Sequence, residues 1–380
     1  MSVAAIFDSF LMGGFECSTH RRRDRRRLDL IAATRHDKLA VADYASMVRH
    51  GLRTIRDGTR WHLIEAAPGR YDWESFLPML RASREAGVQV VWDLCHYGWP
   101  DWIDIWSPAF VDSFARFAAA TASLVRDETD NIPFYAPVNE ISYWSWAGGT
   151  RAILNPHARG RGSELKTQLV RTSIAAMDAV RGIDPRARFV QIDPVINVVP
   201  RSPRSRAGAE RYRQAQYEAW DMLAGHIRPD LGGSPDYLDI IGVNYYSNNQ
   251  WFTGGRTIDR SHALYRPFRE LLLETHRRYR KPVIVAETGA EGDARVPWLR
   301  YVCDEVRAAL EAGVPVAGIC LYPVVDYPGW TNGRHCQVGL LGFPDSLGRR
   351  PVHAPLADEL LTQQLRFGTV QNYRAEESAR

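Results

Sequence analysis

Short apolar runs that end in polar residues recur along the whole chain, and a stretch with helical spacing of hydrophobic residues follows most of them. Eight such runs span residues 9–18, 51–61, 88–98, 132–142, 187–197, 238–247, 281–290 and 316–326. Their apolar residues are consecutive rather than alternating, which is typical of parallel strands covered on both faces. Helices are expected between them, most clearly over residues 73–87, 107–128, 164–184 and 297–313.

Eight strand–helix repeats favour a closed (β/α)8 TIM barrel of the α/β class over a doubly wound sheet. One barrel can account for most of the 380 residues, because α/β barrels exceed the usual size of a domain. We therefore predict a single catalytic barrel domain over residues 1–366 and a C-terminal tail over residues 367–380. The glycine-containing run at residues 13–15 lacks the G-x-G-x-x-G pattern, so no dinucleotide site is expected.

Composition and charge narrow the possible partners and the compartment. The 48 Lys and Arg residues nearly balance the 44 Asp and Glu residues, and no recognition motif accompanies the basic segment RRRDRRR (21–27), so nucleic acid is not an expected partner. No apolar run is long enough to cross a membrane, and the first residues lack the basic region of a signal peptide. Five cysteines without C-x-x-C spacing predict a cytoplasmic protein without a disulfide framework or zinc site. The oligomeric state stays open.

The predicted strands end in residues that carry chemistry: Glu16, His20, Arg56, His96, Asn139, Glu140, Asp193, Asn244, Tyr246, Glu287 and Asp326. In a TIM barrel these ends meet at the C-terminal mouth, where the active sites of such enzymes lie. Glu140 follows the fourth strand and Glu287 closes the seventh, so we expect them to face each other across the mouth. Two carboxyl groups about 5 to 5.5 Å apart there could cleave a glycosidic bond with retention of configuration.

Five segments in a fixed order add a resemblance to a known family: FLMGGFECSTH (10–20), LCHYGWPDW (94–102), PVNE (137–140), LDIIGVNYYS (238–247) and VIVAETG (283–289). They resemble the opening strand and the H-W-D-L-P-x-W, T-x-N-E-P, D-F-I-G-I-N-Y-Y and I-T-E-N-G motifs of glycoside hydrolase family 1, the β-glucosidases and their relatives in clan A. The resemblance implies that Glu140 is the general acid and base and that Glu287 is the nucleophile. It also implies contacts to the sugar or to Glu287 from Arg56, His96, Asn139 and Tyr246.

The sugar-recognition positions depart from that family. His20 stands where the family has a glutamine. The segment YPVVDYPGW (322–330) takes the place of W-S-L-L-D-N-F-E-W, so that Tyr322 replaces a tryptophan, Trp330 is kept and the family's glutamate is absent. We therefore expect His20, Tyr322 and Trp330 to contact a substrate that differs from a plain glucoside. The arginines at 21–27 could serve an anionic substrate, or they could form a solvated loop.

The sequence thus predicts a retaining glycosidase that cleaves a β-glycosidic bond of a carbohydrate or glycoside, anionic or extended, with divergent sugar specificity. Two carboxyl groups suffice for this chemistry, so no metal or cofactor is expected. The alternative is a transglycosidase of polysaccharide or glycoconjugate biosynthesis that uses the same centre. A non-catalytic carbohydrate-binding barrel is less consistent with the paired glutamates. The hypothesis of a metal-dependent hydrolase has still less support, because His62, His96 and His335 lack the spacing of a metal site.

Overall fold

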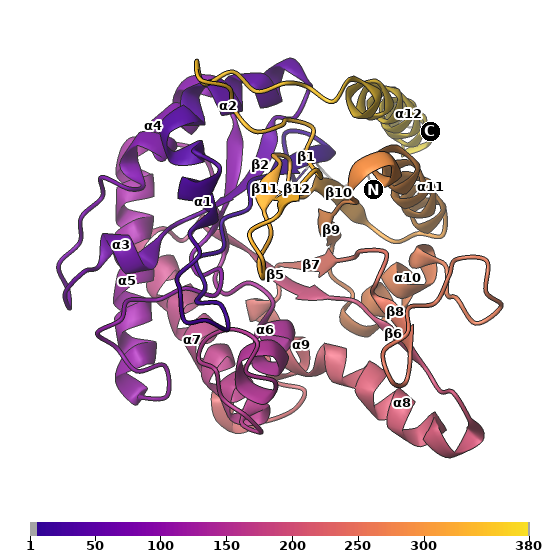
Figure 1. Cartoon of the computed structure of the whole chain (residues 1–380), viewed down its shortest axis with the longest axis horizontal. Coiled ribbons are helices and arrows are strands. Elements are labelled where there is room, and N and C mark those ends of the chain that lie inside the picture. The colour runs from indigo at the N-terminus through magenta and orange to yellow at the C-terminus, as the bar shows by residue number, and fades with distance from the viewer. Residues whose placement is uncertain (1–5, 379–380) are drawn as a thin grey trace.

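A computed structural model describes residues 6–378, and a closed barrel of eight parallel strands lies at its centre (Figure 1). Around the barrel the order is β1-β10-β9-β7-β5-β4-β3-β2. The strands are β1 (Leu11–Gly14), β2 (Thr54–Gly58), β3 (Gln89–Asp93), β4 (Phe134–Ala136), β5 (Arg188–Pro194), β7 (Ile240–Asn244), β9 (Val283–Thr288) and β10 (Val316–Leu321). Each falls within one of the eight predicted runs, which confirms the TIM barrel.

Two apolar clusters explain why these runs are consecutively hydrophobic. Side chains such as Met12, Val91, Ile192 and Ile284 fill the inside of the barrel. A much larger cluster fills the space between the strands and the surrounding helices, with Ile55, Val243 and Val285 on the strand side. Because each strand is covered on both faces, both sets of alternating side chains must be apolar.

The helices surround the strands in Figure 1. Helix α5 shows why they form: it begins with a proline in its first turn and buries Phe110, Phe114 and Phe117 on one face, at the spacing of helical turns. The helices are α1 (Leu30–Ala33), α2 (His36–Arg49), α3 (Trp61–Ile64), α4 (Leu77–Ala86), α5 (Pro108–Glu128), α6 (Ile141–Trp144), α7 (Gly162–Ile183), α8 (Arg206–Gln214), α9 (Glu218–Leu223), α10 (Phe268–Tyr279), α11 (Arg295–Glu311) and α12 (Ala354–Ser378).

Several smaller elements were not predicted. They are a π-helix (Ser145–Thr150), the pair β6 (Asn197–Val199) and β8 (Gln250–Phe252), and the pair β11 (Tyr327–Pro328) and β12 (His335–Cys336). Short 3-10 turns occupy residues 203–205, 215–217, 229–231, 235–237 and 292–294.

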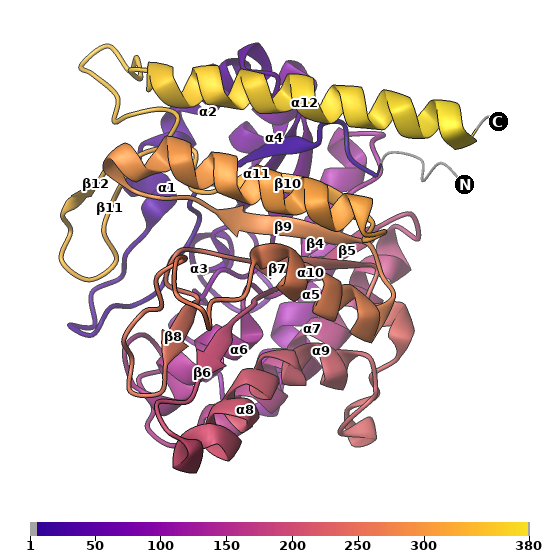
Figure 2. The ribbon, with the colours of Figure 1, turned by 90° about the vertical axis from the view of Figure 1, so that its right-hand side faces the viewer.

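The C-terminal part of the chain is helical. Helix α12 lies alongside α11 (Figure 2) and spans the expected domain boundary at residue 366. The division into a barrel (1–366) and a tail (367–380) stays a prediction, and residues 1–5 and 379–380 lie outside the described residues. Among residues 6–378, none of the helices combines the length and the apolar composition that a membrane crossing needs.

Candidate active site

Glu140 and Glu287 both lie at the C-terminal mouth of the barrel, and both side chains are buried. Glu287 is part of β9, whereas β4 already ends at Ala136 and Glu140 follows it in a left-handed conformation (φ 49°) at the start of α6. Such a conformation is strained for a residue with a side chain and is common at functional sites. The sequence led us to expect the strands of the two glutamates on opposite sides of the barrel. Only β5 and β7 separate β4 from β9, so the two strands do not lie directly opposite each other.

Glu287 has two hydrogen-bond partners, Arg56 and Tyr246. Its Oε1 accepts a hydrogen bond from Arg56 Nη1 at 2.6 Å, and its Oε2 accepts one from Tyr246 Oη at 2.9 Å. Asp93 binds the other side of the Arg56 guanidinium through both oxygens, at 3.0 and 2.6 Å. Burial alone would raise the pKa of Asp93, but the charge of Arg56 and the contacts with His96 and Arg56 together outweigh burial and hold that pKa below its usual value. Arg56 is thereby fixed in the plane that presents it to Glu287.

Glu140 has neutral partners. Asn244 Nδ2 donates to its Oε1 at 2.8 Å, and the Tyr97 hydroxyl donates to its Oε2. Burial, and after it the charge of Glu287, raise the pKa of Glu140 to about 8. At neutral pH Glu140 is therefore protonated, whereas Glu287 is bound to the cationic Arg56.

Asn139 connects the surroundings of the two glutamates. Its Oδ1 accepts from Arg56 Nη2 at 2.8 Å, so its amide nitrogen must donate, to His96 Nε2 at 2.9 Å and to the Tyr97 hydroxyl at 3.1 Å. His96 Nδ1 in turn lies 2.8 Å from Asp93 Oδ2, which can only accept. In these contacts Nδ1 of His96 donates a hydrogen bond to Asp93, and Nε2 accepts one from Asn139.

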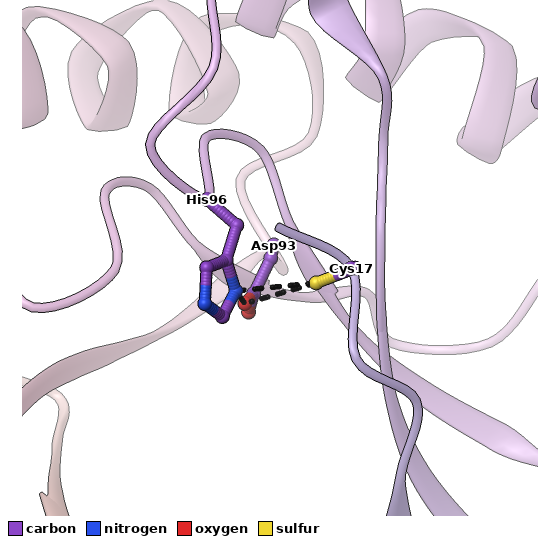
Figure 3. A group of neighbouring side chains, drawn as sticks. All are labelled: Cys17, Asp93 and His96. Carbon is purple, nitrogen blue, oxygen red and sulfur yellow. Dashed lines mark hydrogen bonds and ion pairs between the residues drawn. The ribbon is translucent and has the colours of Figure 1, made fainter. Parts of the chain in front are cut away.

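Cys17, Asp93 and His96 place three potential metal-ligand atoms within 4.8 Å of one another (Figure 3). Their chemistry does not suit a cation. Asp93 already binds the Arg56 guanidinium, and burial raises the pKa of the Cys17 thiol well above its ordinary value, which disfavours the thiolate that binds metals. The cluster instead orients Arg56 and His96.

The three residues expected to recognise the sugar line one wall of the mouth. The rings of His20 and Trp330 lie 4.8 Å apart, and the Tyr322 ring lies 4.9 Å from the Arg56 guanidinium and parallel to His96. Burial lowers the pKa of His20 to about 3, so this side chain is neutral. Two buried polar atoms of this wall, His20 Nδ1 and Trp330 Nε1, have no hydrogen-bond partner among the described residues. Such atoms usually have a partner, and a ligand could supply it.

Three of the six arginines of the basic segment 21–27 form ion pairs with acidic neighbours. Arg21 and Arg27 both pair with Asp101, and Arg22 pairs with Asp24. Arg27 also donates to the backbone oxygen of Trp99 at 3.0 Å, which fastens the segment to the loop after β3. These contacts favour a structural loop over an anion-binding loop.

Sequence reasoning missed Asp93 and Tyr97, and it assigned no role to Glu16 and Asn244. Glu16 and Asn244 were noted as polar strand ends, but nothing along the chain indicates their partners. Asp93 precedes the motif that contains His96, and Tyr97 follows His96 directly with a left-handed backbone (φ 66°). Their roles become visible only when the ends of the strands are brought together.

A cavity of about 630 Å³ is lined by residues of the segments that follow β4, β5 and β7. Ser142 and Tyr143, directly beyond Glu140, form part of its wall, and the Tyr143 ring lies 6.0 Å from the Tyr97 ring. Its remaining wall includes Trp146, Lys166, Tyr212 and Trp251. Aromatic rings beside polar groups suit a sugar or a flat aglycone. Trp144, in α6 next to this cavity wall, is fully buried and contributes to packing.

Comparison with solved structures places the fold among β-glucosidases. The chain is similar to a mutant of a hyperthermophilic β-glucosidase (TM-score 0.75, 17% identity, covering 93% of this chain and 99% of that one). It is also similar to a β-glucosidase from Thermotoga maritima in complex with azafagomine (0.77, 15%, 95% and 99%) and to the family 1 β-glucosidase from Thermotoga maritima (0.71, 15%, 87% and 87%). No protein-family model and no curated protein matches the sequence. At these identities the likeness establishes a family 1-like barrel fold.

Proposed function

We propose that this protein is a retaining β-glycosidase with a sugar specificity that differs from that of a plain β-glucosidase. The observation that carries the proposal is the contrast between the two glutamates: Glu140 is a buried acid with a pKa of about 8, and Glu287 accepts hydrogen bonds from Arg56 and Tyr246. Paired carboxyl groups with different environments are the signature of acid and nucleophile roles. The β-glucosidase folds of the structural neighbours support a carbohydrate substrate.

The proposed reaction is a double displacement. Glu287 attacks the anomeric carbon while Glu140 gives its proton to the glycosidic oxygen, so that the bond to the leaving group breaks and a glycosyl–enzyme ester forms. Glu140, now a carboxylate, takes a proton from water, and the water oxygen attacks the anomeric carbon and releases Glu287. The carboxyl separation of about 5 to 5.5 Å that this chemistry needs stays a prediction. In this scheme Asn139 contacts the 2-hydroxyl of the sugar.

Transfer to an acceptor other than water is the second candidate, and the cavity beside Glu140 favours it. The acceptor must enter on the side of the general base, because the base removes its proton. A cavity of about 630 Å³ walled by Tyr143, Trp146 and Trp251 can hold a group larger than water in that place. Product analysis in the presence of added alcohols and sugars distinguishes transfer from hydrolysis.

Activity should decline in alkaline solution as Glu140 loses its proton. The proton donor is present below its pKa of about 8 and disappears above it, so kcat/KM for substrates with poor leaving groups should fall about tenfold per pH unit above that value. Tyr97→Phe removes a hydrogen bond that stabilises the carboxylate form, so it should move the decline to higher pH. Initial rates between pH 5 and 10 measure both effects. A profile that stays flat to pH 10 would contradict the assignment of the acid.

The stereochemistry of the first product tests the proposed function. A panel of 4-nitrophenyl β-glycosides is hydrolysed in deuterated buffer, and proton NMR follows the anomeric signal of the released sugar. A retaining enzyme forms the β-anomer first, and the α-anomer appears only by slow mutarotation. Formation of the α-anomer first indicates inversion, and no turnover across neutral, amino and acidic glycosides argues against a glycosidase.

A further inference from the structure

Glu16 is a third carboxyl group at the nucleophile's side of the mouth. It follows β1, is only 6% exposed, and its Oε1 accepts a hydrogen bond from the Ser18 backbone at 3.1 Å. Burial raises the pKa of Glu16, His96 opposes this effect, and the charge of Glu287 adds to it. A chain of close contacts joins Glu16 to Glu287. His96 Nε2 lies 3.9 Å from Glu16 Oε1 and 2.9 Å from the amide nitrogen of Asn139. Asn139 and Glu287 both bind Arg56.

In the part of the chain that the structure describes, neither an arginine nor a lysine forms an ion pair with Glu16. Among the described residues its nearest ion-pair candidate is His96, whose Nε2 lies 3.9 Å from Oε1. That nitrogen already accepts a hydrogen bond from Asn139, and the ring proton is on Nδ1, directed at Asp93. Arg56 is bound to Asp93, Asn139 and Glu287. A buried carboxyl group without a cationic partner is costly, so a ligand that brings donors would relieve it.

Glu16 also lies on the wall where the sequence departs from family 1. Strand β1 pairs with β10 (Gly13 with Leu321), so the segment after β1 and the loop after β10 form one side of the mouth. His20 and Trp330 meet across this junction. Burial and then the charge of Glu16 raise the pKa of Tyr327, in the same loop after β10 that lacks the family's glutamate. Glu16 thus supplies a carboxyl group to a wall that otherwise has lost one.

We propose that Glu16 accepts hydrogen bonds from the sugar bound beside Glu287, and that it makes the site select sugars with hydroxyl or amino groups there against sugars with a carboxylate or phosphate. This inference rests on the proposed glycosidase function. Within residues 6–378, Arg56 is the one arginine that binds the carboxyl groups of this region, Asp93 and Glu287, and Glu16 adds a third carboxyl group. Arg21 and Arg27 are paired with Asp101. The substrate is therefore a neutral sugar or, most favourably, an amino sugar, and not the anionic one considered from the sequence.

Binding of uncleavable thio-linked aryl glycosides tests this inference separately from turnover. Calorimetry compares the β-thioglucoside, its 6-amino-6-deoxy analogue and the β-thioglucuronide. We expect the amino sugar to bind tightest and the uronide weakest, and Glu16→Gln to reduce the ratio between them by about 10- to 100-fold, the size of a charge-assisted hydrogen bond. Glu16→Asp keeps the charge and should keep the order. Glu85→Gln, an exposed site on α4, makes the same charge change and should alter nothing.

The outcomes separate the two proposals. If the binding order and its dependence on Glu16 hold but no glycoside is turned over, the role of Glu16 stands and the glycosidase function fails. If glycosides are turned over but the uronide binds best, or if Glu16→Gln weakens all three ligands equally, the role of Glu16 is overturned. Failure of all three ligands to bind the wild-type protein overturns it as well.

Discussion

Replacement of Glu287 by alanine is expected to reduce the turnover of aryl β-glycosides by a factor on the order of 10⁵, because no other group can form the glycosyl–enzyme ester. Sodium azide should restore part of the activity. The anion fits the space of the missing carboxylate and attacks the anomeric carbon from the same face, so the product should be an α-glycosyl azide. Release of 4-nitrophenol measures the rate, and NMR identifies the azide product.

Glu291→Ala provides a matched control for this variant. Glu291 lies four residues beyond Glu287, is exposed and pairs with Arg334, so its loss should leave turnover almost unchanged. An inactive Glu291→Ala would point to damage to the loop after β9. A Glu287→Ala variant that keeps a tenth or more of wild-type activity without azide would contradict its assignment as nucleophile.

Replacement of Glu140 by alanine is expected to slow substrates according to their leaving groups. Positioned acids contribute about 10²- to 10⁴-fold, and a poor leaving group needs the whole of that contribution. Methyl or phenyl glycosides should therefore lose about three orders of magnitude in kcat/KM, whereas 2,4-dinitrophenyl glycosides, whose leaving group departs without a proton, should lose little. Measuring kcat/KM across leaving groups of different pKa gives the comparison.

Azide separates the roles of the two glutamates. With Glu140→Ala and an activated substrate, azide should attack the glycosyl–enzyme and yield a β-glycosyl azide, opposite in configuration to the product of Glu287→Ala. Equal losses for good and poor leaving groups would show that Glu140 does not act as the acid.

The barrel could be predicted because its signal is local. Consecutive apolar residues report burial on both faces of a strand, and all eight runs contain a strand of the closed sheet. Helix α7 begins and ends within two residues of the predicted 164–184, since the spacing of its buried residues is regular. The π-helix at Ser145–Thr150 and the pair β6 and β8 carry no such periodicity and were missed.

The sequence indicates which residues form the candidate site better than it indicates the contacts between them. Arg56 and Glu287 lie within β2 and β9, and Glu140 and Tyr246 shortly follow β4 and β7. Parallel strands of a closed barrel bring such residues together at the mouth. The hydrogen bond from Tyr97 to Glu140 depends on a left-handed turn that no pattern marks. The run of arginines at 21–27 suggested an anionic substrate, since the sequence does not show that Arg21 and Arg27 form ion pairs with Asp101.

Covalent trapping tests the central claim most directly. A 2,4-dinitrophenyl 2-deoxy-2-fluoro-β-glycoside of a sugar that the enzyme turns over should form a glycosyl–enzyme that hydrolyses very slowly, because the fluorine destabilises the oxocarbenium-like transition state. Mass spectrometry of the intact protein and of its peptic peptides should show one added fluorosugar, attached to Glu287. A label on Glu140 or Glu16, or no label on an enzyme that cleaves the parent glycoside, would contradict the account.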